Sequence, residues 1–296
     1  MNVTAPHFSE GAGIADILTL EKIDPGLYRG PVIPSLLTRT FGGQVAAQAL
    51  SAAVDSVDPE CALHSLHGYF VGPGDSTKPT IFHVDTVRDG RSFRSRQVTA
   101  VQNGEAIFIM NCSFHRRGDL GLEHSDEIPD VPKPHDIPVD YDALPESAQT
   151  LLKSWTEWDF RIVNTADYDG RTHARQLVWF KSKKRLPDIE HFHQCTLAYM
   201  SDMTLLYTAL VPHPGAEIQM ASLDHAIWFL RPFRADEWLL YDQITPSAHA
   251  GRALTHGRVF NETGDLVAIV TQEGLTRNRA KGVSILPMTQ ANPATT

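Results

Sequence analysis

The sequence contains few cysteines, and their spacing forms no recognisable pattern. The three cysteines among 296 residues, Cys61, Cys112 and Cys195, lie far apart, and none belongs to a Cys-x-x-Cys pair. Neither a disulfide framework nor a structural zinc site is therefore indicated. Such cysteine usage is typical of a protein from a reducing compartment, so we expect a cytoplasmic location.

Long hydrophobic runs are also missing. No segment approaches the roughly 18 consecutive apolar residues that a membrane-spanning helix needs. Residues 1–22 lack the basic start and apolar core of a secretion signal. We expect neither a membrane span nor export.

Positive charge is in deficit. Lysine and arginine total 26 against 35 aspartates and glutamates, which gives a formal net charge of −9. Such a surface repels nucleic acid, so no nucleic-acid partner is expected. A local cluster formed by Lys181, Lys183, Lys184 and Arg185 could still bind a ligand with a few phosphates. The same cluster fits a solvated strand end equally well.

Several enzyme signatures are absent. The chain has no GxSxG nucleophile elbow, no GxxxxGK[ST] phosphate loop, no GxGxxG after a strand and no HExxH. Metal-capable side chains occur in the segment from Glu190 to His193 and at Cys195, but a His-x-His pair alone is a weak signal. His64 and His67 fit strand histidines. We expect no metal and no cofactor.

What the chain does contain is a faint internal repeat at an offset of about 160 residues. In the first half, apolar spacing predicts a helix over 42–54, followed by strands within 64–73, 80–87, 92–101 and 105–114. In the second half, the same order appears as a helix over 195–210 and strands within 222–232, 237–244, 253–260 and 265–275. Each repeat predicts an α+β unit in which an antiparallel sheet wraps one long helix.

A proline-rich connector separates the two halves. Pro129, Pro132, Pro134 and Pro138 disfavour regular structure there. We therefore expect a first unit at 1–117, a linker at 118–150, a second unit at 151–280 and a frayed tail at 281–296.

Asp202 is the most informative polar residue of the second predicted helix. Apolar residues three and four positions away share its face, which predicts a largely buried carboxylate. Such a group needs partners or a function, although it could instead cap its own helix or meet water on a rotated helix. Ser222, which opens the next predicted strand, and Gln272, within an apolar run, are candidate partners. Each also fits an ordinary role, as a strand-end hydroxyl or a solvent-facing amide.

These residues and their surroundings resemble the acyl-CoA thioesterase II family of the TesB type. The similarity runs through LEKIDPGLYRG, FGGQVAAQAL, HSLHGYFVGPGDSTKP and VRDGRSFRSRQVTAVQNG, then through RLPD, HQCTLAYMSD, SLDHAIWFLRPF, EWLLY and VTQEGLTR. It implies two fused hot-dog units whose sheets pair into a double hot-dog. It also implies hydrolysis of fatty acyl-CoA to a free fatty acid and CoA without a cofactor.

By this resemblance, the catalytic group consists of Asp202, Ser222 and Gln272. Asp202 would be the base that activates water, and the other two would hold that water. Serine stands where the family commonly has threonine, so the side chain loses the β-branch that stiffens χ1. Backbone N–H groups would stabilise the oxyanion.

One active site per chain is expected, because the first predicted helix offers Gln44 and Gln48 but no carboxylate before Asp55. The acyl chain needs an apolar slot, for which the candidates are Phe41, Tyr69, Trp228 and Phe229, although core packing suits these side chains as well. The resemblance also implies contacts between basic surface residues and the CoA phosphates, without indicating which residues make them.

Two other functions stay open. A hot-dog acyl-CoA hydratase or dehydratase would need an Asp and His pair, but Asp224 and His225 are adjacent on a strand and should face opposite sides. A non-catalytic acyl-CoA-binding module is favoured only by the change to Ser222. A homo-oligomer is compatible with the fused units and is not required by them.

Overall fold

The computed structural model describes residues 13–33, 35, 37–141, 149–150, 152–153, 155–163 and 174–278. The predicted tail at 281–296 lies outside the described residues. So do residues 1–12 of the segment that we expected to lack a secretion signal. Within the described residues, thirteen strands form one sheet. The described part begins with α1 (Ile14–Leu18), β1 (Glu21–Asp24) and β2 (Leu27–Gly30).

The first unit continues as predicted, with a long helix followed by four strands. These elements are α2 (Gly42–Asp55), β3 (Cys61–Phe70), β4 (Thr80–Asp89), β5 (Phe93–Gln102) and β6 (Glu105–Arg116). The turn that joins β5 to β6 has two residues in the left-handed backbone conformation, Asn103 with φ 53° and Gly104 with φ 84°.

The second unit repeats this order. Its elements are β7 (Trp158–Val163), β8 (Arg175–Ser182), α4 (Glu190–Ser201), η3 (Leu205–Leu210), β9 (Ile218–Ser222), β10 (Asp224–Phe229), β11 (Leu239–His249), β12 (Arg252–Asn261) and β13 (Leu266–Asn278). Strands β1, β2, β7 and β8 precede the long helices and were not predicted. For β1 and β2 the reason is that each has only four residues, which are mostly polar or partly exposed.

The strand order shows how the two units join. It is β1-β2-β4-β5-β6-β3-β10-β13-β12-β11-β8-β7, with β9 pairing to β13. Each half is thus an antiparallel sheet, and the halves meet where β3 pairs with β10 across the register from Tyr69 opposite Asp224 to Ser65 opposite Trp228. The α+β double hot-dog is confirmed.

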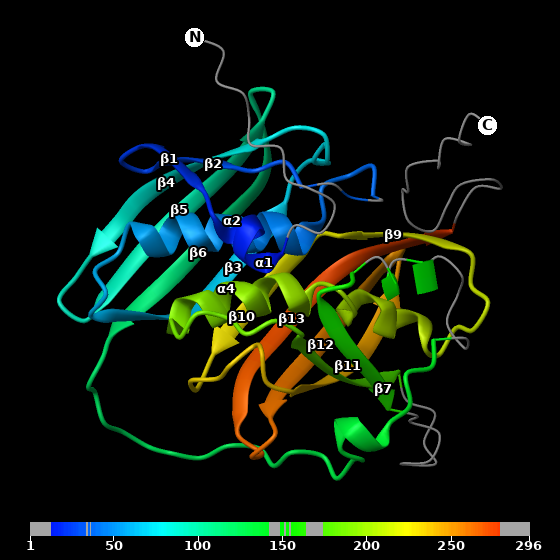
Figure 1. Cartoon of the computed structure of the whole chain (residues 1–296). Coiled ribbons are helices and arrows are strands. Elements are labelled where there is room, and N and C mark those ends of the chain that lie inside the picture. Colours follow the sequence, from blue (N-terminus) through cyan, green and yellow to red (C-terminus); the bar gives the residue numbers. More distant parts are fainter. Residues whose placement is uncertain are drawn as a thin grey trace.

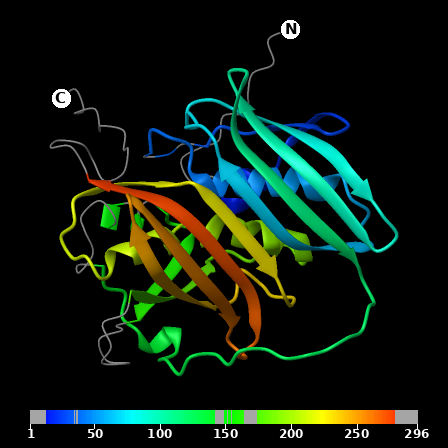
Figure 2. The same ribbon diagram turned by 180° about the vertical axis from the view of Figure 1, so that it is seen from behind.

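Both long helices lie on the same side of the sheet. Figure 1 shows α2 and α4 in front of the strands, and Figure 2 shows the strands from behind, covering both helices. The two helices pack against each other. One buried cluster runs through both units and includes Leu50 and Ala53 of α2 with Leu197 and Ala198 of α4. The C-terminal end of α4 lies close to the N-terminal start of α2.

The predicted second helix over 195–210 was wrong in its extent. Helix α4 begins at Glu190, ends at Ser201, and is followed by a turn and the 3-10 helix η3. Short polar side chains at Ser201, Asp202 and Thr204 explain the break, because they offer hydrogen bonds that compete with a continuous helix. Asp202 consequently stands at the C-terminal cap of α4, with φ −83° and ψ −9°.

The connector has almost no regular structure between Gly118 and Asp140, apart from the 3-10 turn η1 (Pro134–Asp136). In Figures 1 and 2 it runs as an extended chain around the lower edge of the sheet. Trp179 fixes part of it, since its indole N–H donates to the carbonyl of Pro132 at 3.0 Å. The unit boundaries themselves stay a prediction.

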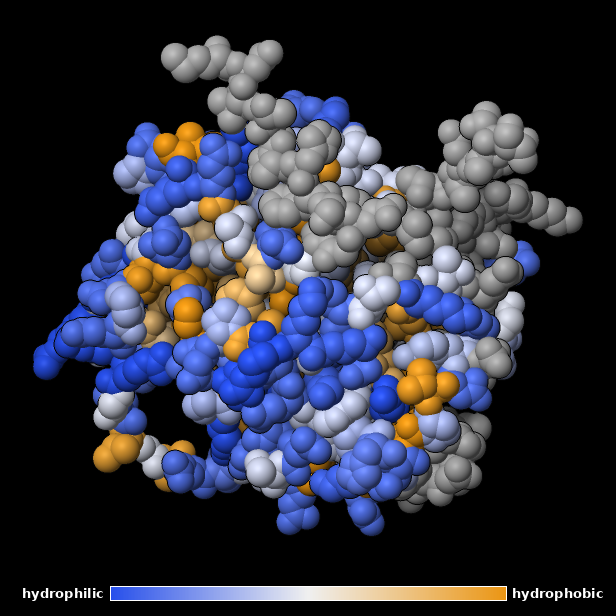
Figure 3. Space-filling view, in the orientation of Figure 1, coloured by the Kyte–Doolittle hydropathy of each residue, from blue (hydrophilic) through white to orange (hydrophobic). Residues whose placement is uncertain are grey.

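The surface view of the helix side is mainly hydrophilic, with hydrophobic side chains gathered toward its middle (Figure 3). This distribution is ordinary for a chain with 21% charged residues. No helix in the described ranges is both long enough and apolar enough to span a bilayer.

Candidate active site

The structure brings the three predicted site residues into direct contact. Oδ1 of Asp202 accepts a hydrogen bond from Nε2 of Gln272 at 2.6 Å and one from Oγ of Ser222 at 3.3 Å. Nε2 of Gln272 also donates to Oγ of Ser222 at 3.0 Å. Three side chains from three different elements thus form one closed hydrogen-bonded group.

Each of these side chains is positioned by its own element. Asp202 caps α4, Ser222 is the last residue of β9, and Gln272 lies inside β13. Ser222 therefore ends a strand, where we predicted that it would open one, because the chain breaks at Leu223 before β10 begins. The solvent-facing alternative for Gln272 was wrong, since its side chain is fully buried.

The first unit supplies a fourth contact that sequence reasoning missed. The backbone N–H of Gly43 donates to Oδ2 of Asp202 at 2.8 Å. Gly43 belongs to the first turn of α2, where backbone N–H groups have no partner within the helix and the helix dipole favours negative charge. The glycine pair in FGGQ, unusual at a helix start, was the available signal.

Gly42 allows this close approach between the helices. A Cβ atom at Gly42 would lie 2.7 Å from Oδ2 of Asp202 and 3.0 Å from the ring of Phe70. A carboxylate could then no longer reach the α2 N-terminus. Glycine at this position is thus explained by contact with the site and not by backbone conformation.

Asp202 sits in an environment that disfavours its charge. Burial raises the pKa of its carboxyl above the ordinary value, while His225 and the hydrogen bonds from Gln272, Gly43 and Ser222 lower it in part. The net direction is upward. A carboxylate with a raised pKa is a stronger base than a solvated aspartate, which suits proton abstraction from water.

A histidine and a serine behind Asp202 hold the turn on which it lies. His225 is fully buried, and its Nε2 lies 2.8 Å from Oγ of Ser201. The hydroxyl of Tyr241 donates to the Ser201 carbonyl at 3.2 Å. Burial lowers the pKa of His225, and the nearby Asp202 and Asp224 carboxylates oppose this shift only in part. Asp224, its neighbour, turns the other way and contacts His67, so the two face opposite sides as predicted.

Asp202 and Ser222 open onto a cavity of about 370 Å³ between the two units. Its walls are mainly apolar and come from both halves: Leu37, Val45, Phe70 and Ile107 from the first, and Trp155, Met203, Leu206, Met220 and Leu275 from the second. The Asp202 side chain is half-buried at the wall of this cavity, and burial dominates its electrostatics, in agreement with the predicted largely buried carboxylate. A hydrophobic substrate can thus reach the carboxylate.

Only one of the four predicted slot residues lines the cavity. Phe41 does so, and its ring packs on Trp155 and Tyr199 at centroid distances of 5.4 Å and 5.0 Å. Tyr69 and Trp228 lie exposed on the outer side of the sheet, and Phe229 is buried in the core. Strand alternation explains the difference, because one-residue steps in β3 and β10 reverse the side that a residue faces.

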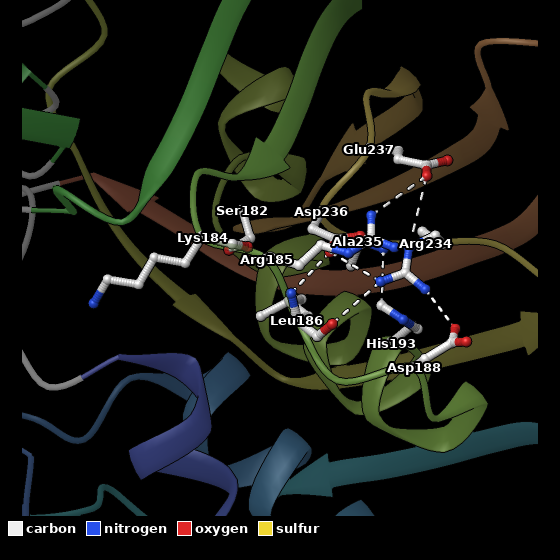
Figure 4. Close-up of polar contacts among 10 residues, drawn as sticks. All are labelled: Ser182, Lys184, Arg185, Leu186, Asp188, His193, Arg234, Ala235, Asp236 and Glu237. Atoms are coloured by element: carbon white, nitrogen blue, oxygen red, sulfur yellow. Dashed lines mark hydrogen bonds and ion pairs between the residues drawn. The ribbon is translucent and has the colours of Figure 1, made fainter.

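The predicted basic cluster is occupied by protein groups. Lys184 pairs with Glu157, and Nζ of Lys183 donates to the carbonyl of Thr156 at 2.9 Å. Lys181 lies over the ring of Trp238. In Figure 4, Arg185 points toward Asp236 and Glu237, while Lys184 points away from them. The solvated strand-end alternative therefore fits better than a phosphate site.

Arg234 and Asp236 form the centre of that network (Figure 4). Arg234 donates to both carboxylate oxygens of Asp236, at 2.9 and 3.0 Å, and to Asp188 at 2.6 Å. Burial would raise the pKa of Asp236, but Arg234 and the Leu186 N–H lower it overall. The network ties the loop before α4 to the loop before β11, which is a structural role.

The metal-capable segment takes a structural role as well. Nδ1 of His193 accepts the Ala235 N–H at 3.2 Å. No group of metal-capable side chains is found in the ranges that the structure covers. The three cysteines are buried and unpaired, and burial raises the pKa of the Cys112 thiol to about 12, which disfavours a nucleophilic thiolate.

Comparisons with known proteins agree with this architecture. Residues 151–275 match the family described as acyl-CoA thioesterase, and residues 34–115 match the acyl-CoA thioesterase N-terminal domain. Acyl-CoA thioesterase 2 of Haemophilus influenzae is 38% identical, over 88% of this chain and 96% of its own. Acyl-coenzyme A thioesterase 8 of Mus musculus is also 38% identical, over 89% and 88%.

Solved structures give the same result. Acyl-CoA thioesterase II TesB2 of Mycobacterium marinum is 49% identical with a TM-score of 0.80, over 90% of this chain and 99% of its own. A tesB protein of Mycobacterium avium subs paratuberculosis is 29% identical with a TM-score of 0.76, over 89% and 98%. The two fused units, the shared cavity and these similarities along most of the chain lead to one conclusion: the protein belongs to the acyl-CoA thioesterases of the thioesterase II, or TesB, type.

Proposed function

We propose that the chain hydrolyses fatty acyl-CoA to a free fatty acid and CoA, with Asp202 as the base that activates the attacking water. The observation that carries this proposal is the hydrogen-bonded group of Asp202, Ser222 and Gln272 at the wall of an apolar cavity. Thioester hydrolysis at neutral pH needs a base for water, an apolar site for the acyl chain and donors for the oxyanion.

The roles of the three side chains follow from their atoms. Water in the cavity donates a proton to Asp202, whose carboxylate is already aligned by Gln272 and Gly43. The hydroxyl of Ser222 accepts from Gln272 and so has its own proton directed toward Asp202 or the water. The water oxygen forms a bond to the thioester carbon, the C–S bond breaks, and the CoA thiolate leaves and takes up a proton.

The N-terminus of α2 supplies the donors for the oxyanion in this proposal. Gly42 lines the cavity at the first position of a helix of fourteen residues, and the N-cap residue Phe41 makes no side-chain capping bond. The N–H of Gly43 is already bound to Asp202, which leaves the N–H of Gly42 for the oxyanion. Backbone N–H groups at a helix start stabilise negative charge through their own dipoles and through the dipole of the helix. The base comes from the second unit and the donors from the first, so a single site needs both.

In the described part of the first unit, the polar residues of α2 are buried or engaged by other contacts. Gln44 and Gln48 of α2 are buried, and Nε2 of Gln48 donates to the carbonyl of Ile17. Asp55, at the far end of α2, binds Lys22 and the hydroxyl of Tyr28. These contacts support one active site per chain.

The two alternative functions receive less support. A hydratase or dehydratase would draw on Asp224 and His225, but neither lines the cavity and His225 is engaged by Ser201. For a binding module, the change to Ser222 would have to disable the site, yet its hydroxyl keeps both expected contacts.

We expect the unmodified chain to release CoA from acyl-CoA substrates of several chain lengths, measured as free thiol. We expect the Ser222→Thr variant to turn these substrates over as fast as the unmodified chain or faster. The contact from Ser222 to Asp202 is long at 3.3 Å, and a β-branched residue would restrict χ1 and steady that contact. Tight acyl-CoA binding with no thiol over hours would favour the binding module instead. A large loss in Ser222→Thr would show that the geometry around Ser222 differs from the one proposed.

A cytoplasmic location is proposed on the strength of three buried cysteines that remain unpaired. Assembly into a homo-oligomer stays a prediction.

A further inference from the structure

The cavity is open to solvent, and the exposure of its wall residues marks where it opens. Three of its lining residues are exposed, namely Arg39, Val71 and Pro73, while the others are buried or half-buried. All three belong to the first unit. Asp202 and Ser222 stand on the wall that the second unit contributes. Solvent therefore meets the cavity at Arg39, away from the core of the molecule.

Arg39 is the one basic residue among the described residues that line the cavity, as Asp202 is the one acidic residue. It forms no ion pair within the described part of the chain. Its backbone is fixed, because Arg39 and Asp75 form an antiparallel bridge and the N–H of Thr40 donates to the Gly74 carbonyl at 3.0 Å. The Asp75 carboxylate is turned toward Thr77, at 2.6 Å from its hydroxyl.

Acyl-CoA has an apolar end and a strongly anionic end. If the thioester carbon lies at Asp202, the acyl chain is accommodated by apolar walls, and the pantetheine arm leads the nucleotide out through the open end. The nucleotide carries phosphates that a surface of net charge −9 would repel without a local cation. A guanidinium suits phosphate because it offers several donors in one plane.

We propose that Arg39 binds a phosphate group of the CoA nucleotide at the cavity mouth and is a determinant of selectivity for CoA thioesters. This inference rests on the proposed function, since it takes the acyl-CoA to be bound with its thioester at Asp202. The residue acts in binding, away from the reacting atoms, so its effect belongs in KM and not in kcat.

The test compares Arg39→Gln with the unmodified chain on acyl-CoA, on acyl-dephospho-CoA and on the acyl-pantetheine thioester, which has no phosphate. For acyl-CoA, we expect KM to rise about 10-fold with kcat retained, since a hydrogen bond to a charged group is lost. For the acyl-pantetheine thioester, kcat/KM should be unchanged. The dephospho substrate tells which phosphate is bound: the effect persists if Arg39 binds the diphosphate and disappears if it binds the 3′-phosphate.

Arg91→Gln is the matched control. Arg91 is exposed in the turn between β4 and β5 and does not line the cavity. Its replacement by glutamine removes the same charge as Arg39→Gln does. Its KM for acyl-CoA should not change. Equal losses on acyl-CoA and on the pantetheine thioester, or an unchanged KM for acyl-CoA in Arg39→Gln, would overturn the proposal.

Equilibrium binding of free CoA separates this proposal from the function on which it rests. Calorimetry should show weaker CoA binding by Arg39→Gln than by Arg91→Gln, by the same factor of about 10. If the unmodified chain binds CoA through Arg39 but releases no thiol from any acyl-CoA, the hydrolytic function fails while the phosphate contact stands. If thiol is released and CoA binding is insensitive to Arg39, the hydrolytic function stands and the proposed phosphate contact fails.

Discussion

Asp202→Asn should lower kcat/KM for acyl-CoA by about 1000-fold, which is the range expected for the loss of a general base. The new amide cannot accept the proton of the attacking water. The site can otherwise accommodate it, because Oε1 of Gln272 has no partner among the described residues and can turn to accept from the amide. The measurement is thiol release under saturating and subsaturating substrate.

The same substitution should not destabilise the fold. The pKa of Asp202 is raised in the folded chain, so the folded state binds its proton more tightly than the unfolded state does. The stability contribution of the group therefore falls as pH rises from the unfolded pKa through the raised folded pKa, and the cost of burying the ionised carboxylate is fully present above that folded pKa. An uncharged amide removes that cost, and the melting temperature at pH 7 should stay equal or rise.

The pH profile offers an internal control for this substitution. In the unmodified chain, the acid limb of kcat/KM should lie above the ordinary aspartate value of 3.8, because only ionised Asp202 can act as a base. Residual activity in Asp202→Asn should lack that limb. A variant that keeps both full turnover and the same limb would rule out Asp202 as the base.

Gln272→Met should lower kcat/KM by about 100-fold, in the range observed when one donor is removed from an active site. Methionine has a similar size, but it cannot donate to Asp202 at 2.6 Å or to Ser222 at 3.0 Å. The carboxylate then loses its shortest hydrogen bond, and Ser222 loses the contact that directs its hydroxyl. The acid limb of the pH profile should also move upward, because a donor that lowers the pKa of Asp202 has gone.

Gln48→Met is the control for the loss of a buried amide. Gln48 is also fully buried and uses Nε2 for a single bond to a backbone carbonyl, but it belongs to the first unit. Its replacement should reduce stability while leaving activity per folded molecule nearly intact. Equal losses of activity in the two variants would mean that Gln272 acts only through packing.

The repeat and the candidate site residues could be predicted from the sequence, for different reasons. Helix α2 has a continuous apolar spacing and was found within one residue at its C-terminal end. Asp202 stood out because a carboxylate on an apolar helical face needs an explanation. Its partnership with Ser222 and Gln272 came from the resemblance, because contacts across 20 and 70 residues leave no local pattern.

The remaining features depend on tertiary contacts. The end of α4 at Ser201 was missed, because the apolar spacing continues through η3 while only short polar side chains mark the break. The contact from Gly43 to Asp202 joins two units 159 residues apart and uses a backbone N–H, which no side-chain pattern reveals. Tyr69 and Trp228 were misplaced because the sequence alone does not say which side of a strand faces the cavity.

The central claim is that Asp202 activates water and does not attack the thioester itself. Single turnover in H₂¹⁸O, with enzyme in excess over acyl-CoA, tests this claim most directly. Direct water attack predicts one ¹⁸O in the fatty acid released in the first turnover and no label in the peptide that contains Asp202. An unlabelled fatty acid together with ¹⁸O in Asp202 would contradict it, because that outcome requires an acyl-aspartyl intermediate.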